Sequence, residues 1–471
     1  MSVRKARKYT RNARVHLFGR RVNLLAEVGW WQAEVVRQDA AIKVNLGGGL
    51  GMEGEWKTKT LNQLGRIVTG KTPPSSAVDA FGGNIPFITP SDMNGARTIS
   101  TTARTLSTSG RSLVKNAAIP KNAVMVSCIG SDMGKAALAG TDCVTNQQIN
   151  SIIIETDDSP LFVYYNLSTR KSEICGSAGG SAQPILSKSA FGRFEIDLPP
   201  LPEQRAIAHI LGTLDDKIEL NRRRNQTLEA MARALFKDWF VDFGPIRAKM
   251  EGREPYLPDE LWQLFPDRLD DEGKPEGWER KKVGECFSLT MGQSPPGDTY
   301  NDIGDGLPFF QGKTDFGFRY PENRKYCSAP TRIANAEDTL VSVRAPVGDI
   351  NLAWEKCCIG RGVAAVRHAS GARSFTYHAI WSLQEELKQF EHTGTVFGAI
   401  NRKQFEVLPF VEPDQRLIDF YERVCGALDD KVRNNTEDSR TLAQLRDTLL
   451  PKLISGELRI EDAEKFLENA L

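Results

Sequence analysis

Two halves of this 471-residue chain repeat each other in order, and this duplication restricts the possible folds more than any other feature. Trp56 and Gly70 return 222 residues later as Trp278 and Gly292. Further along, the spacing becomes 215, 211 and then 214, as shown by the pairs Cys143 and Cys358, Phe194 and Phe405, and Leu214 and Leu428. A spacing that drifts without breaking the order indicates two diverged copies with insertions and deletions in their loops.

Each copy consists of a globular part followed by a helical part. The globular parts are rich in Gly, Ser, Thr and Pro and contain short β-favouring runs, such as 151–154 (SIII) and 339–343 (TLVSV), which predict mixed, mostly β domains. A proline-rich boundary at 198–204 (LPPLPEQ) precedes the first helical part. The predicted segments are a basic, disordered extension or linker (1–52), a first globular domain (53–197), a central helical spacer (198–275), a second globular domain (276–407) and a distal helical spacer (408–471).

The helical parts carry a heptad repeat, in which apolar residues alternate steps of three and four. Asn221 and Asn435 occupy matching positions in the two copies, and polar residues at such positions commonly fix the register of paired helices. The predicted helix–helix seam comprises Leu214, Ile218, Asn221, Leu228, Leu235 and Trp239 in the first copy, and Leu428, Val432, Asn435, Leu442, Leu449 and Leu453 in the second.

Two such helices in one chain can bury their apolar stripes against each other. Equivalent copies pack most simply about a pseudo-two-fold axis, which predicts an antiparallel two-helix coiled coil that separates the two similar domains. The overall expectation is therefore an α+β fold. A seam of 26 residues is about 39 Å long, close to the roughly 34–36 Å of one turn of B-DNA.

Charge and composition exclude several classes of protein. The sequence has no apolar run long enough to cross a membrane and no cleavable signal. Its eight cysteines show no ligand spacing and predict reduced thiols in a cytoplasmic protein. Residues 1–21 hold eight basic and no acidic residues, which leaves 53 basic against 60 acidic residues elsewhere. Binding of DNA would therefore depend on local basic patches, and a duplicated coiled-coil adaptor that binds only proteins is the alternative.

Several short segments resemble the specificity (S) subunits of Type I restriction–modification systems. They are 198–204 (LPPLPEQ), 214–217 (LDDK), 238–240 (DWF), 242–245 (DFGP), 277–279 (GWE) and 451–458 (PKLISGEL). With the duplication, the resemblance covers about residues 53–460. The second copy departs from the pattern at 408–415 (LPFVEPDQ), where the boundary is one residue longer and lacks the double proline.

The resemblance implies a DNA-binding subunit without catalysis of its own. Its two globular domains would be target-recognition domains, each reading one half of a split, asymmetric site on double-stranded DNA. The paired helices would dock two methyltransferase (M) subunits, and restriction–motor (R) subunits would complete the complex. The resemblance implies no cofactor in this subunit, since S-adenosylmethionine, ATP and Mg²⁺ would be bound by the partners.

Candidate DNA contacts lie in segments punctuated by Gly, Pro, Ser and Thr. Such segments predict loops, where Arg and Gln can reach base edges and Lys can reach phosphates. The candidates are Lys71, Arg97, Arg104, Lys135 and Gln147 in the first domain, and Lys313, Arg319, Arg324, Arg344 and Arg361 in the second.

Three motifs resemble catalytic sites without the surroundings that such sites need. Residues 65–72 (GRIVTGKT) match a phosphate-binding loop, but two prolines follow and would block the helix that the loop requires. An ATP-dependent enzyme using this loop is therefore a weaker alternative. Residues 49–54 (GLGMEG) lack a convincing βαβ unit, and the acids of 266–274 (PDRLDDEGK) are too close together for a nuclease metal site.

Overall fold

The computed structural model describes residues 55–178, 184–391 and 398–460, together with Asp462, Ala463 and Leu467. It also gives the backbone of two short antiparallel strands, β1 (Val15–Leu17) and β2 (Arg20–Val22). The rest of the predicted extension 1–52 lies outside the described residues, so its disorder stays a prediction.

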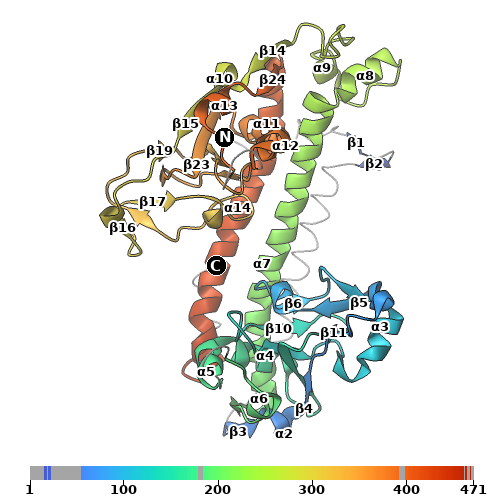
Figure 1. Cartoon of the computed structure of the whole chain (residues 1–471), viewed down its shortest axis with the longest axis vertical. Helices are drawn as coiled ribbons and strands as arrows, with labels where there is room; N and C mark the ends of the chain where they lie inside the picture. Colours follow the sequence, from blue (N-terminus) through green and yellow to red (C-terminus); the bar gives the residue numbers. More distant parts are fainter. Residues whose placement is uncertain are drawn as a thin grey trace, which may run out of the picture. The chain divides into compact units, whose positions relative to one another are not determined.

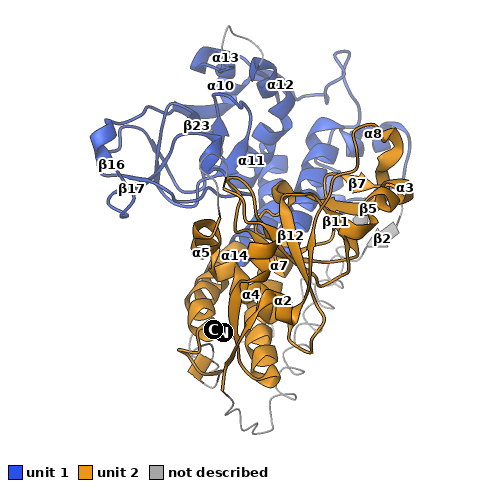
Figure 2. Ribbon diagram, turned by 60° about the horizontal axis from the view of Figure 1, so that its bottom comes forward, with its two compact units in different colours: residues 1–47, 224–435 blue, residues 48–223, 436–471 orange. Residues whose placement is uncertain are grey.

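The chain divides into two compact units, each with one globular domain and parts of two long helices (Figure 2). Unit 1 comprises Met1–Gly47 and Arg224–Asn435, and unit 2 comprises Gly48–Arg223 and Thr436–Leu471. The long helices are α7 (Leu201–Phe236) and α14 (Gln415–Ile454), drawn green and red in Figure 1.

The first globular domain, in unit 2, consists mainly of strands. Its strands are β3 (Lys57–Thr60), β4 (Gly65–Thr69), β5 (Phe81–Ile88), β6 (Thr98–Ile99), β7 (Thr105–Leu106), β8 (Ala118–Ile119), β9 (Val124–Ser127), β10 (Ala136–Ala139), β11 (Cys143–Thr145), β12 (Ile149–Ile154) and β13 (Glu195–Leu198). Its short helices are α2 (Leu61–Leu64), α3 (Thr108–Leu113), α4 (Pro160–Thr169), α5 (Lys171–Gly176) and α6 (Lys188–Gly192).

The second globular domain, in unit 1, is built in the same way. Its strands are β14 (Glu279–Lys282), β15 (Phe287–Met291), β16 (Tyr300–Asn301), β17 (Leu307–Phe310), β18 (Tyr326–Cys327), β19 (Ile333–Ala334), β20 (Thr339–Ser342), β21 (Ile350–Leu352), β22 (Cys357–Ile359), β23 (Val363–His368) and β24 (Pro409–Glu412). Its helices are α10 (Val283–Cys286), α11 (Arg373–Ser382), α12 (Gln384–Lys388) and α13 (Arg402–Glu406).

The two domains share their sheet topology, which supports the duplication found in the sequence. One sheet has the order β4-β12-β9-β10-β6 in the first domain and β15-β23-β20-β21 in the second. The other has the order β7-β5-β11-β8, matched by β18-β17-β22-β19 with β16 added at the edge. A small sheet closes each domain, β13-β3 in one and β14-β24 in the other. The predicted fold class, two similar and mostly β domains with long helices, is therefore confirmed.

The helices run antiparallel within each unit. In unit 2, Glu203 of α7 pairs with Arg459, just beyond α14, whereas Asp215 further along α7 pairs with Arg446 of α14. In unit 1, Asn225 of α7 accepts from Asn435 of α14 at 2.9 Å, whereas the carbonyl oxygen of Ala232 further along α7 accepts from the Tyr421 hydroxyl at 3.0 Å. Higher residue numbers on one helix thus face lower numbers on the other, as the predicted antiparallel pairing requires.

The seam residues lie in these cores. Eight of the twelve are less than a tenth exposed: Leu214, Asn221, Trp239, Val432, Asn435, Leu442, Leu449 and Leu453. Ile218, Leu228, Leu235 and Leu428 are partly buried and pack against the same clusters. Burial of apolar side chains at heptad positions is the main term that holds such helices together.

The segment after α7, inside the predicted central helical spacer 198–275, is not one continuous helix. The regular helix ends at Phe236, a wider helical turn η5 (Lys237–Val241) follows, and Phe243 adopts a left-handed conformation (φ 54°). The chain then folds back through α8 (Gly244–Met250) and α9 (Asp259–Trp262). It does so because Trp239, Phe240 and Phe265 bury their rings in the core of unit 1.

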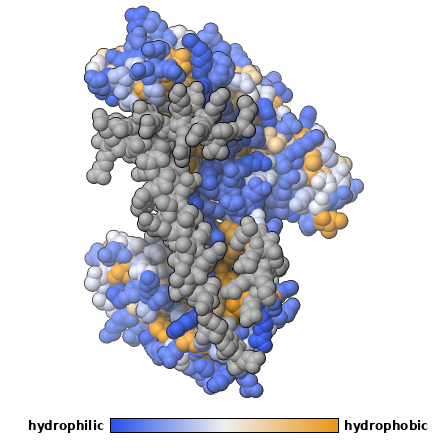
Figure 3. Space-filling view, turned by 180° about the vertical axis from the view of Figure 1, so that it is seen from behind, coloured by the Kyte–Doolittle hydropathy of each residue, from blue (hydrophilic) through white to orange (hydrophobic). Residues whose placement is uncertain are grey.

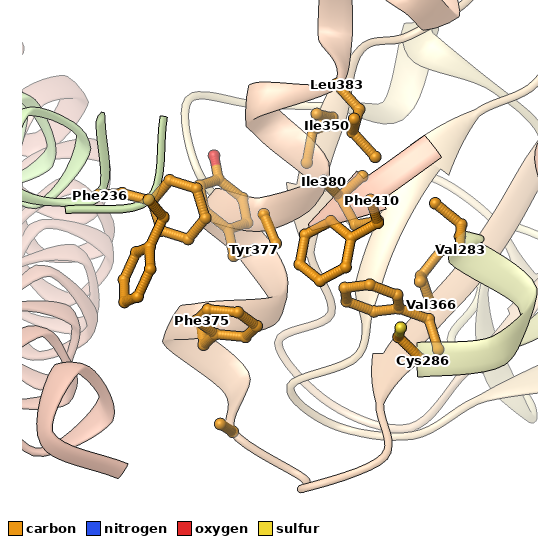
Figure 4. Packing of buried hydrophobic residues seen from close by; sticks show 14 of the residues in the cluster. Phe236, Val283, Cys286, Ile350, Val366, Phe375, Tyr377, Ile380, Leu383 and Phe410 are labelled. Carbon is orange, nitrogen blue, oxygen red and sulfur yellow. The ribbon is translucent and has the colours of Figure 1, made fainter. Parts of the chain in front are cut away.

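Aromatic residues from distant segments form the centre of this core. Phe236 on α7 faces Phe375 on α11, with ring centroids 5.7 Å apart, and Phe410 of β24 lies beyond (Figure 4). β24 falls inside the predicted distal helical spacer 408–471, but it pairs with β14 and belongs to the domain. The helix that follows begins only at Gln415.

Candidate nucleic-acid interface

A basic hollow of about 310 Å³ lies on the second domain. Lys313, Arg344 and Arg361, three of the predicted DNA contacts, line it from three separate segments of the chain. Their neighbours around the hollow include Ser294, Gln311, Gly312 and Thr314. The structure therefore brings together three cations that are up to 48 positions apart in the sequence.

These cations differ in how far they are neutralised. Lys313 pairs with Asp349, the two charged atoms being 2.9 Å apart. No acidic side chain among the described residues pairs with Arg344 or Arg361, and both are exposed. The hollow is thus a local positive patch of the kind that a chain with nearly balanced charge needs for binding to a polyanion.

The first domain has an equivalent edge with different side chains. The loop after β4 meets the β11–β12 turn, where the Lys71 amide donates to the Thr145 carbonyl at 2.9 Å. In the second domain the Gln293 amide donates to the Ile359 carbonyl at 3.0 Å. The same backbone framework therefore presents Lys71, Thr72 and Gln147 in one domain, and Gln293, Ser294 and Arg361 in the other.

The repeated glycines Gly70 and Gly292 make this framework possible. A Cβ at Gly70 would lie 2.0 Å from the Asn146 carbonyl oxygen, and one at Gly292 would lie 2.1 Å from that of Gly360. No side chain fits at either distance, so the two segments can approach only because glycine is present. This explains why both copies carry glycine at this position.

The remaining candidates do not join these edges in any recorded contact. Arg104 is exposed and lies over the Phe81 ring, 4.0 Å from its centroid. Arg324 is exposed and pairs with Glu322 at 2.9 Å, and Lys135 pairs with Asp132 at 2.7 Å. A DNA-binding role for these residues stays a prediction.

For Arg319 the structure corrects the prediction. Its side chain is 1% exposed, pairs with Glu229 and Asp429, and lies 3.5 Å from the centroid of the Tyr377 ring. A side chain in this position cannot meet DNA while the domain stays folded. Arg97 is partly withdrawn as well, because it pairs with Asp216 and donates to the Gly212 carbonyl at 3.0 Å.

Sequence reasoning missed Thr72, Ser294, Gln311 and Thr314. These residues lie beside the predicted contacts, but they are uncharged, and nearly all of the predicted contacts are cationic. Applying the repeat spacing of 222 to Thr72 leads directly to Ser294, so the signal was present in the duplication.

The phosphate-loop match at residues 65–72 is not a nucleotide site in this structure. Gly65 begins strand β4, which pairs with β12, and no helix follows Lys71 until the short turn η2 (Val78–Ala80). The arrangement therefore lacks the helix N-terminus that would face phosphates.

The described residues contain no group of three or more His, Cys, Asp or Glu placed to hold a metal ion. None of their helices is both long enough and apolar enough to cross a membrane. Most of the described surface on the face in Figure 3 is hydrophilic.

Comparison with known proteins gives one consistent result. Residues 53–230 match the family described as "Type I restriction modification DNA specificity domain". The MjaIX specificity subunit of a Type I restriction enzyme from Methanocaldococcus jannaschii is 26% identical over 429 residues, covering 87% of this chain and 94% of that protein. The HindI specificity subunit from Haemophilus influenzae is 25% identical, covering 63% of this chain and 76% of that protein.

A solved structure supports the fold. The crystal structure of a Type I restriction–modification S subunit from M. genitalium matches with a TM-score of 0.53 at 17% identity, covering 87% of this chain and 97% of that one.

Proposed function

We propose, from the premise that the chain belongs to the specificity subunits of Type I restriction–modification systems, that each globular domain reads one half of a split, asymmetric DNA site. The single observation that carries this proposal is the pair of equivalent edges. One backbone framework occurs twice and displays different side chains each time, so the two domains can prefer different sequences.

The basic hollow would position the second domain on the DNA backbone. Phosphate contacts fix orientation and register without reading sequence, and Arg344, which is exposed and not neutralised by a described acid, suits that role. Lys313 is a weaker candidate, because Asp349 already pairs with it.

The chain would act through partners and perform no reaction itself. The resemblance implies two methyltransferase subunits docked along α7 and α14, with restriction–motor subunits bound to that assembly. S-adenosylmethionine, ATP and Mg²⁺ would be held by those partners. The specificity subunit would determine which adenines the methyltransferases reach, by determining where the complex binds.

A footprinting experiment tests the split site. The full chain, purified with its methyltransferase partner, is expected to protect two short DNA tracts separated by an unprotected gap of fixed length. One continuous protected tract would contradict the proposal. DNA retention that is neither sequence-specific nor sensitive to salt would favour a protein-binding adaptor instead.

Methylation mapping provides an independent test in the host. Adenines methylated in the presence of this subunit, and unmethylated in its absence, are expected to lie in a motif of two parts. The same motif in both strains would show that this chain does not determine the target.

A further inference from the structure

We propose that Gln147 and Arg361 are specificity-determining residues at equivalent positions of the two domains, where Gln147 reads adenine and Arg361 reads guanine. This inference rests on the function proposed above and names two base pairs, one in each half of the site.

Backbone geometry makes the two positions equivalent. Gln147 lies between β11 and β12, and Arg361 lies between β22 and β23. Besides the two bonds already described, the Gly70 amide donates to the Ile149 carbonyl at 3.0 Å, and the Gly292 amide donates to the Val363 carbonyl at 2.9 Å. Each residue is therefore framed by one pair of backbone hydrogen bonds, and the two pairs match.

A neighbouring hydroxyl contacts each of the two side chains. The Thr72 hydroxyl donates to Oε1 of Gln147 at 2.6 Å. Nε of Arg361 lies 3.4 Å from the hydroxyl oxygen of Ser294, the residue that replaces Thr72 in the second copy. In both cases the contact leaves the end of the side chain available, since a carbonyl oxygen can accept twice and the terminal guanidinium nitrogens take no part in it.

The exchange of glutamine for arginine argues against a phosphate contact. A phosphate carries the same charge whatever the sequence, so a position that binds it gains from a cation in both copies. Glutamine is uncharged, and in the second domain Lys313 and Arg344 supply further positive charge beside Arg361. A position that keeps its backbone frame but changes its chemistry is what two different half-sites require.

The base preferences follow from hydrogen-bond geometry in the major groove. The glutamine amide nitrogen donates to N7 of adenine and its Oε1 accepts from the N6 amino group, whereas arginine donates twice, to O6 and to N7 of guanine. Both residues are exposed, as a base contact requires.

The test uses reciprocal substitutions in the full chain, expressed with its methyltransferase partner, followed by mapping of methylated adenines across the genome. Arg361→Gln is expected to change one base pair in one half-site, with guanine losing preference over adenine by roughly 10- to 100-fold. Gln147→Arg is expected to change one base pair in the other half-site in the opposite direction. Arg361→Ala, which offers no hydrogen bond, is expected to relax the first of these positions to all four bases.

The outcomes separate this inference from the proposed function. If the unmodified complex methylates a split motif and the three variants leave that motif unchanged, the inference is overturned while the function stands. A uniform loss of methylation at every site, with the motif retained, would also overturn it, because that result indicates a phosphate contact. A wild-type complex that methylates an unsplit motif would instead overturn the proposed function.

Discussion

Arg319 of the second domain places Nη2 2.7 Å from Oδ1 of Asp429 on α14, and both side chains are buried. The same guanidinium pairs with Glu229 on α7. In unit 2, Arg97 holds the corresponding position 222 residues earlier and pairs with Asp216 of α7. In each unit, an arginine common to both copies therefore links the globular domain to a long helix by an ion pair.

Replacing Arg319 is expected to destabilise unit 1 strongly. Arg319→Met leaves Asp429 buried without its cation, and loss of one partner of a buried ion pair typically costs about 3–5 kcal/mol. Urea unfolding followed by circular dichroism measures the change. Arg324→Met is the matched control, because the pair of Arg324 with Glu322 is exposed and its loss should change the free energy of unfolding little. Equal effects of the two substitutions would contradict the anchoring role.

The asparagines of the seam provide a second test. Nδ2 of Asn435 donates to Oδ1 of Asn225 at 2.9 Å, and both residues are buried. Asn435→Leu alone leaves a buried amide short of a partner and should cost about 1–3 kcal/mol, whereas Asn225→Leu with Asn435→Leu should cost much less. A double-mutant cycle in urea measures the coupling. Additive effects of the two substitutions would show that the amides do not act together.

The heptad periodicity predicted the two long helices and the burial of the seam residues, because heptad spacing is a local property of the sequence. It did not predict which asparagine would meet Asn435, because that depends on the register of two helices about 200 residues apart in the chain. The sequence singled out Asn221 and Asn435 by their matching positions, whereas in the structure Asn435 donates to Asn225.

The assignment of Arg319 to DNA failed for a similar reason. Its loop-like surroundings predicted exposure, and its acidic partners Glu229 and Asp429 lie 90 residues before it and 110 residues after it in the chain. The duplication nevertheless held a clue. Arg97 and Arg319 are identical at equivalent positions, as a shared structural role requires, whereas Gln147 and Arg361 differ at equivalent positions. Identity between the two copies therefore indicates a structural residue such as Arg319, whereas a difference indicates a candidate base-contacting residue such as Arg361.

Because His378 is buried, we expect unit 1 to lose stability in mild acid. Burial, with a smaller effect of Arg319, lowers the pKa of His378 well below its ordinary 6.5. Below pH 6.5 the unfolded state takes up a proton on this imidazole, whereas the native state keeps it neutral. The free energy of unfolding is therefore unaffected by His378 above pH 6.5 and decreases below it, by up to about 1.4 kcal/mol per pH unit. Melting temperatures between pH 5 and 8 measure this, and His378→Gln should flatten the dependence. An unchanged slope in that variant would assign the effect to other groups.

The hollow on the second domain predicts a specific change in salt dependence. Arg344→Gln removes one exposed cation beside Arg361 and should weaken binding to all DNA sequences alike. The slope of log K against log salt should become shallower by about one, because one fewer counterion is released. Fluorescence anisotropy of the complex with the proposed methyltransferase partner, measured across a salt series, gives the slope. Lys403→Gln on α13 removes an exposed charge outside the hollow and should leave it unchanged. If both variants shift the slope equally, general surface charge accounts for binding, and the hollow has no particular part in it.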